Sequence, residues 1–166
     1  MPNCSGIGSE VAPVSFERRL AELGINLPPA PKPVAAYVPA VRSGSLLFVS
    51  GQVPLVGGQI AYRGKVGKDL STEEGQQAAR TCALNALAVV RAAAGSLDQV
   101  RRIVRLGVFV QCSDDFKEQP LVANGASQLL VDIFGEAGRH ARTAVGCNAL
   151  PLDSAVEVEL VVELGA

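Results

Sequence analysis

Five stretches of the chain carry apolar residues with the period of two, or in the short unbroken runs, that β-strands favour. In one of them Val104, Leu106, Val108 and Val110 fall on the same face. The stretch 42–44 is predicted to form a hairpin turn, and the glycine-rich stretch 56–70 a loop with room for one short strand. The predicted strands are 34–41, 45–53, 100–111, 141–149 and 155–164.

Three other stretches carry apolar residues at helical spacing, at 15–24, 71–95 and 117–134. Ser71 and Glu74 have the S-x-x-E spacing of a capping box. Asp114 or Asp115 is expected to cap the third helix. Each helix is expected to end at a glycine, a residue that favours helix C-termini: Gly24, Gly95 and Gly135.

This order of strands and helices predicts an α+β domain whose two long helices cover one face of a sheet. The other face also carries apolar side chains, because the run 46–49 (LLFV) is apolar on both sides of its strand. Large exposed apolar patches are rare on monomers. We therefore expect a second subunit to cover this face.

The chain has 166 residues, which is enough for one domain with its own core. Four prolines between 28 and 33 forbid a helix there and favour an extended segment. We expect an N-terminal tail, short helix and proline-rich lead-in over 1–33, followed by the domain proper over 34–166. The sequence shows no signal-peptide pattern and no apolar run of the roughly 20 residues that span a membrane. A cytoplasmic protein without membrane contact is expected.

The formal net charge is −1 and aromatic residues make up 4% of the chain, so a nucleic-acid-binding surface is not expected. The four cysteines fit no zinc spacing and are expected to be reduced, mostly buried thiols. His140 is the single histidine. Neither a metal site nor a cofactor is therefore expected, and His140 is not expected to act as the base of a Ser-His-Asp triad.

Arg142 is the first candidate for chemistry. It lies on a predicted strand whose Thr143 face suits packing on helices, so Arg142 is expected on the opposite face, towards the subunit contact. A guanidinium in such a place requires an anion. That anion is either an internal carboxylate or the carboxylate or phosphate of a ligand held by two hydrogen bonds.

Glu157 and Glu159 are the second candidates, because they share one face of the last strand. One interpretation is an ordinary solvated strand face. The other is that one of the two carboxylates orients or activates a water molecule as a general base.

Several segments resemble the reactive intermediate deaminase family, the YjgF-type family that is also called L-PSP endoribonuclease. Residues 48–54 (FVSGQVP) resemble its S-G-Q-x-P signature, and 141–145 (ARTAV) its P-A-R-[ST] segment. Leu150 and Pro151 with 156–159 (VEVE) resemble its C-terminal segment. The stretches 122–127 (VANGAS) and 138–142 (GRHAR) are similar to one branch of the family.

The resemblance implies a chorismate-mutase-like fold with a six-stranded mixed sheet, two helices on one face, and homotrimers with clefts between subunits. It implies that Arg142 holds a substrate carboxylate and that Glu157 positions the attacking water. Three residues depart from the family pattern: Ala144 replaces a common cysteine, Ser127 a tyrosine and His140 a proline. The other cleft positions implied are Tyr37, Ser50, Gly51 and Asn124, with Ala144 beside the arginine.

The function implied by the resemblance is hydrolysis of small 2-imino acids to 2-keto acids and ammonia. An imine carbon is already electrophilic, so this reaction requires only a carboxylate clamp and a positioned water, without cofactor or metal. Two alternatives are a regulatory trimer that binds a carboxylate-bearing metabolite without chemistry, and an endoribonuclease or translation inhibitor.

Overall fold

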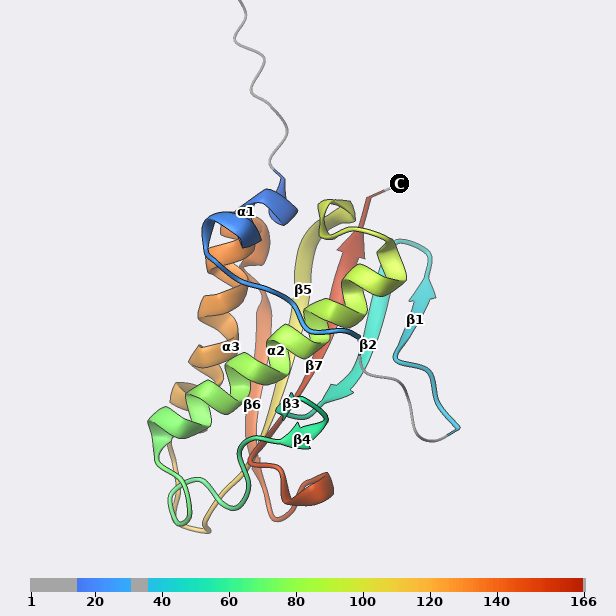
Figure 1. The fold of residues 1–166 in the computed structure, drawn as a ribbon. Helices are drawn as coiled ribbons and strands as arrows, with labels where there is room; N and C mark the ends of the chain where they lie inside the picture. The colour runs from blue at the N-terminus through green and yellow to red at the C-terminus, as the bar shows by residue number, and fades with distance from the viewer. Residues whose placement is uncertain (1–14, 31–35, 166) are drawn as a thin grey trace, which may run out of the picture.

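A computed structural model describes residues 15–30 and 36–165 (Figure 1). Within these ranges the chain forms three α-helices and seven strands, with three short 3-10 turns. The helices are α1 (Phe16–Glu22), α2 (Thr72–Ala94) and α3 (Gln119–Phe134). The strands are β1 (Ala40–Ser43), β2 (Leu46–Gln52), β3 (Leu55–Val56), β4 (Gln59–Ile60), β5 (Val100–Gln111), β6 (Ala141–Cys147) and β7 (Val156–Leu164).

Five strands form one mixed sheet in the order β1-β2-β7-β5-β6. β5 and β6 pair in parallel, and the other neighbours pair antiparallel. This arrangement confirms the predicted α+β class. In the described residues the main sheet has five strands where six were expected. A separate two-stranded hairpin, β3-β4, begins one residue before the predicted loop 56–70 and lies mostly within it.

The two long helices lie on one face of this sheet, as predicted (Figure 1). The core lies between them and the sheet, and β7 contributes alternate residues to it. On β5 an irregularity between Ile103 and Arg105 breaks the alternation, so Ile103 joins Leu106 in the core and the prediction that Val104 does so is wrong. On the opposite face, large apolar side chains remain exposed, namely Val41, Phe48 and Val145. The fold of one chain therefore leaves a partly apolar sheet face without a helix over it.

The start of α2 has the predicted capping box. Ser71 Oγ accepts a hydrogen bond from the backbone N–H of Glu74 at 3.1 Å, and the Glu74 carboxylate accepts one from the Ser71 N–H at 2.8 Å. Gly95 ends the helix in the left-handed region, at φ 85°. Both ends of this helix were thus predicted from local residues.

The predicted cap of α3 is wrong. The helix begins at Gln119 after Glu118, whose side chain makes no capping hydrogen bond, and Asp114 and Asp115 lie in the preceding turn. Pro120 explains the later start, because a proline lacks a backbone N–H and fits an α-helix only in its first turn.

The first hairpin also differs from its prediction. β1 begins at Ala40, since 36–39 are not strand and 34–35 lie outside the described residues. The turn falls at Gly44 and Ser45 rather than at 42–44, with Gly44 at φ 61°. A glycine adopts this backbone conformation without the strain that a side chain would bring.

The carboxylate of Asp98 ties the start of helix α1 to the rest of the domain. Asp98 accepts hydrogen bonds from the backbone N–H groups of Phe16, at 2.6 Å, and Glu17, at 3.1 Å, and from Ser15 Oγ at 3.0 Å. The Phe16 ring packs edge-on against Phe134 of α3, with 4.7 Å between centroids. In 15–30 and 36–165 there is no helix with the length and apolarity that crossing a bilayer requires.

Candidate functional site

Arg142 lies on the outer strand of the sheet, and its side chain points to the helix-covered face. Its register partner on the parallel neighbour β5 is Leu106, a fully buried core residue that faces the helices. The prediction that Thr143 packs on the helices and that Arg142 faces away from them is therefore wrong. Parallel pairing with β5 decides the face, and Thr143 pairs instead with Gly107.

Two neutral side chains of α3 fix the guanidinium. Arg142 Nη1 donates to Asn124 Oδ1 at 2.8 Å and to Ser127 Oγ at 3.0 Å. Among the ion pairs of the described residues, none involves Arg142. The alternative of an internal carboxylate is thus not realised in 15–30 and 36–165, and the positive charge stays available to an anion.

Asn124 was predicted at this site, whereas Ser127 and His140 were noted only as departures from the family pattern. Ser127 Oγ lies 3.0 Å from His140 Nε2, and His140 Nδ1 lies 2.6 Å from the carbonyl oxygen of Gly138. Burial lowers the pKa of His140 below its ordinary value of 6.5; the Gly138 carbonyl opposes this and the Arg142 charge adds to it. The spacing of Asn124 and Ser127 was a signal in the sequence, since residues three apart in a helix lie on the same face.

Glu157 lies on the opposite face of the sheet. Its register partner on β5 is Phe109, and the space beside it is created by Gly51 of β2. A Cβ atom at position 51 would lie 2.8 Å from the Glu157 carboxyl carbon, so a side chain there would displace the carboxylate. Burial, and to a lesser degree the charge of Glu159, raises the pKa of Glu157 above its ordinary value.

Glu159 occupies the next position on this face and has a different partner. Its carboxylate accepts a hydrogen bond from Arg105 at 3.1 Å, and Gly107 leaves room for it on the neighbouring strand. Glu159 is therefore neutralised by a neighbouring arginine. Glu157 forms no salt bridge in the described part of the chain and so remains the candidate base.

The remaining predicted positions divide between the two faces. Ala144 shares the face of Arg142, is half-buried and packs against the core. Ser50 and Gly51 lie on β2, where Ser50 Oγ donates to the carbonyl of Val38 at 2.8 Å. Tyr37 is half-exposed in the segment that leads to β1. The role of each as a ligand contact stays a prediction.

Arg142 and Glu157 are not brought together within one chain. Two strand spacings and three residues of register separate them, which amounts to roughly 14 Å between their backbones. Their side chains also point to opposite faces of the sheet. One small molecule cannot contact both groups of the same chain.

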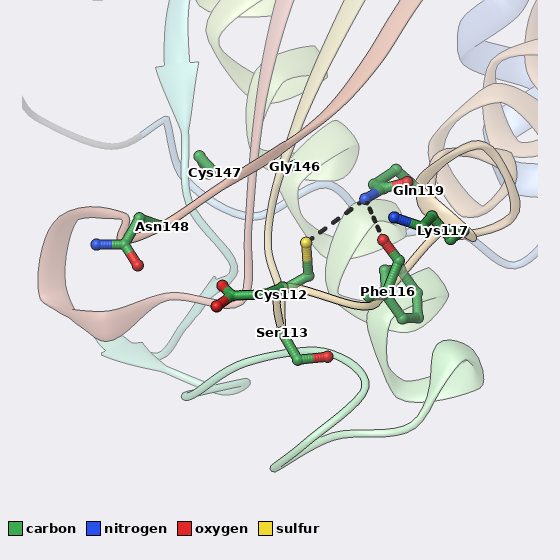
Figure 2. Close-up of a pocket in the computed structure, with 9 residues that line it drawn as sticks. Cys112, Ser113, Phe116, Lys117, Gln119, Gly146, Cys147 and Asn148 are labelled. Atoms are coloured by element: carbon green, nitrogen blue, oxygen red, sulfur yellow. Dashed lines mark hydrogen bonds between the residues drawn. The ribbon is translucent and has the colours of Figure 1, made fainter.

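A pocket of about 390 Å³ lies further along the edge of the sheet, where β5 and β6 end and α3 begins (Figure 2). Gln119 Nε2 donates to Cys112 Sγ at 3.6 Å and to the Phe116 carbonyl at 2.9 Å. Gly146 leaves room for these groups, since a Cβ there would lie 2.9 Å from the Cys112 sulfur. Neither Arg142 nor Glu157 lines this pocket, and none of its lining residues was among the predicted site positions.

Residues 17–164 match the family model described as "YjgF/chorismate_mutase-like, putative endoribonuclease". Protein TCP17 of Trypanosoma cruzi is 50% identical over 94% of this chain and 98% of its own length. The crystal structure of Atu1372 from Agrobacterium tumefaciens, a protein of unknown function, is 48% identical, covers 90% of this chain and 92% of that one, and has a TM-score of 0.84.

Two more distant relatives have names or ligands that bear on chemistry. A 2-iminobutanoate/2-iminopropanoate deaminase of Dermatophagoides farinae is 28% identical over 83% of this chain and 93% of its own. Escherichia coli TdcF, solved with bound serine, is 27% identical, covers 82% of this chain and 94% of that one, and has a TM-score of 0.61. With the matched family model spanning 17–164, the chain belongs to the YjgF/chorismate mutase-like family.

Proposed function

We propose that this protein binds small carboxylate-bearing metabolites at Arg142 and hydrolyses 2-imino acids to 2-keto acids and ammonia. The observation that carries the proposal is the state of the Arg142 guanidinium. It is exposed, held by two neutral acceptors, and has no carboxylate partner in the described residues. A guanidinium in this state is suited to bidentate binding of a ligand carboxylate.

Glu157 supplies the second element of the reaction. As a general base its carboxylate takes a proton from water while the water oxygen forms a bond to the imine carbon. That proton, and then the remaining hydroxyl proton of the tetrahedral intermediate, pass through the carboxylate to the nitrogen. The C–N bond breaks, the carbonyl forms and ammonia leaves. The raised pKa of Glu157 suits this role, because a group must both accept and return the proton.

We further propose that the two elements meet between subunits of a homotrimer. Within one chain Arg142 and Glu157 lie roughly 14 Å apart on opposite faces, so a complete site requires the Glu157 face of one copy beside the Arg142 edge of another. The exposed Val41, Phe48 and Val145 side chains support an interface on that face. The deaminase among the relatives and the serine bound by TdcF support the substrate class.

A binding protein without catalysis is the second candidate. It is favoured by the same separation, because a carboxylate bound at Arg142 of one chain has no general base within reach. The description of the matched family model includes a putative endoribonuclease, but the chain itself argues against that activity: the net charge is −1, and aromatic residues are only 4% of the chain.

The test is keto-acid release from a 2-imino acid generated freshly by an amino-acid oxidase. Wild type is expected to accelerate release. Arg142→Ala should weaken substrate binding about 10- to 100-fold, through the loss of charge-assisted hydrogen bonds. Glu157→Gln should retain binding and lose about 100-fold or more of turnover. Arg18→Ala is the matched control, since the only polar side-chain contact of Arg18 within 15–30 and 36–165 is an exposed ion pair with Glu22 of α1.

Light scattering on the same samples gives the assembly state, which makes a negative result interpretable. Wild-type trimers that bind a 2-keto acid through Arg142 but do not accelerate release would favour the binding protein. Failure of Arg142→Ala to alter either binding or turnover would refute the proposal.

A further inference from the structure

His140, Ser127 and Arg142 form a continuous chain of hydrogen bonds across the helix-covered side of the sheet edge. Arg142 Nη1 lies 3.0 Å from Ser127 Oγ, which lies 3.0 Å from His140 Nε2. His140 and Arg142 are two residues apart, so they project from the same side of the chain towards α3. Ser127 lies between a cation and an imidazole.

Which atom donates each hydrogen bond follows from the group at one end of the series, the carbonyl of Gly138. The Gly138 carbonyl can only accept, so His140 Nδ1, 2.6 Å away, carries the imidazole proton. In the neutral ring Nε2 is then an acceptor, and it receives the hydroxyl proton of Ser127. Ser127 Oγ in turn directs a lone pair at Arg142 Nη1. The carbonyl of Gly138 thus determines which atom donates and which accepts in every hydrogen bond from His140 to Arg142.

This arrangement leaves one edge of the guanidinium for a ligand. Asn124 and Ser127 use both hydrogens of Nη1. The remaining donors, Nε and Nη2, have no recorded acceptor among the described residues, and together they form the edge that matches a carboxylate. A rotation of the guanidinium would lose this match, so the acceptors on Nη1 decide which edge is presented.

We propose that His140 is a positioning residue, which acts through Ser127 to hold the Arg142 guanidinium ready for a carboxylate. The inference rests on the proposed function of Arg142 and extends it to a residue that does not touch the ligand. Loss of the imidazole frees the Ser127 hydroxyl to rotate, and the acceptor facing Nη1 is then no longer fixed.

This series of hydrogen bonds makes carboxylate binding at Arg142 depend on pH. A ligand carboxylate offsets the Arg142 charge that opposes protonation of His140, so binding and protonation favour each other. Affinity should rise as pH falls through the His140 titration. The other charged groups around the imidazole are Arg139, which pairs with Glu136 at 2.8 Å, and Arg102 and Glu163, which line the same surface pocket as His140.

The experiment titrates pyruvate, a 2-oxo acid whose carboxylate stays ionised, into the assembled full-length protein by calorimetry between pH 5 and 8. Wild type should bind about fivefold more tightly at pH 5 than at pH 7.5. His140→Gln offers an acceptor of similar reach that does not titrate. It should bind within about twofold of wild type at pH 7.5 and lose the pH dependence. His140→Ala should bind about 3- to 10-fold more weakly.

Nitrogen NMR of the imidazole gives an independent readout, because His140 is the only histidine of the chain and its signals are unambiguous in untagged protein. We expect the Nδ1–H tautomer, and a titration midpoint that rises in Arg142→Ala and on addition of pyruvate. An Nε2–H tautomer, or a midpoint unaffected by both changes, would overturn the inference.

The variants separate the two proposals. If Arg142→Ala binds pyruvate as wild type does, the carboxylate site itself is refuted. If Arg142→Ala abolishes binding while His140→Ala leaves affinity and its pH dependence unchanged, the site stands and the role of His140 is refuted. If His140→Gln keeps the wild-type pH dependence, the role of His140 is refuted as well, and Glu157 becomes the candidate for the titrating group.

Discussion

Gly125 of α3 packs directly against the backbone of α2, and we expect Gly125→Ala to destabilise the protein. A Cβ at this position would lie 2.7 Å from the carbonyl carbon of Gln76 and 2.9 Å from its Cα. Carbon atoms in contact ordinarily stay about 3.5–4.0 Å apart. The obstacle is backbone, which cannot rotate away, so the helices would have to separate by about 1 Å.

The magnitude follows from two opposing effects. Alanine is about 1 kcal/mol more favourable than glycine within a helix. Overpacking costs about 1–3 kcal/mol, and the upper end applies where a main chain blocks the new methyl group. The net loss of unfolding free energy is then about 2 kcal/mol, although the substitution improves helix propensity. Helix separation would also move Asn124, the neighbouring residue that holds Arg142.

Urea unfolding followed by circular dichroism measures this loss, at one fixed protein concentration because assembly contributes to stability. The midpoint should fall by about 1 M for a chain of this size. Gly75→Ala is the matched control on α2: its nearest atoms belong to the side chains of Val122, at 3.0 Å, and Val66, at 3.2 Å, which can shift. A Gly125→Ala midpoint equal to that of wild type or of Gly75→Ala would refute the reasoning.

Two further predictions concern carboxylates. Asp98→Ala should release α1, because three hydrogen-bond donors lose their acceptor. Hydrogen exchange of the amides in 16–22 should then speed up markedly. Asp114→Ala, a control in an exposed turn, should leave this exchange unchanged. Glu157→Gln should gain stability relative to wild type as pH rises above about 4.5, because the folded state resists ionisation of Glu157 and this cost is absent below the unfolded pKa. Urea midpoints at pH 4 to 7 check this, and parallel curves for the two proteins would contradict it.

The elements that were predicted well are those specified by neighbouring residues. The capping box at Ser71, the glycine end at Gly95 and the full extent of β5 depend on local backbone chemistry and on alternation. The start of α3 was missed because the constraint of Pro120 was underestimated against the capping preference of the aspartates.

The face of Arg142 could not be read from its own strand. On β6 the alternation favours the wrong face, because the apolar Val145 shares the face of Thr143 and is exposed on the open side of the sheet. The register with β5 settles the question, and that register is a long-range property. The contact of Ser127 with His140 depends in the same way on how α3 packs beside the edge strand.

The glycines beside the two carboxylates of the open sheet face link positions that are far apart in the chain. Gly51 accommodates Glu157, and Gly107 accommodates Glu159. A larger residue at position 51 is tolerated only after position 157 has become shorter, so the order in which such substitutions can accumulate during evolution is fixed. In descendants in which Glu157 has lost its catalytic role, Gly51 should be free to change, but only after position 157 has changed.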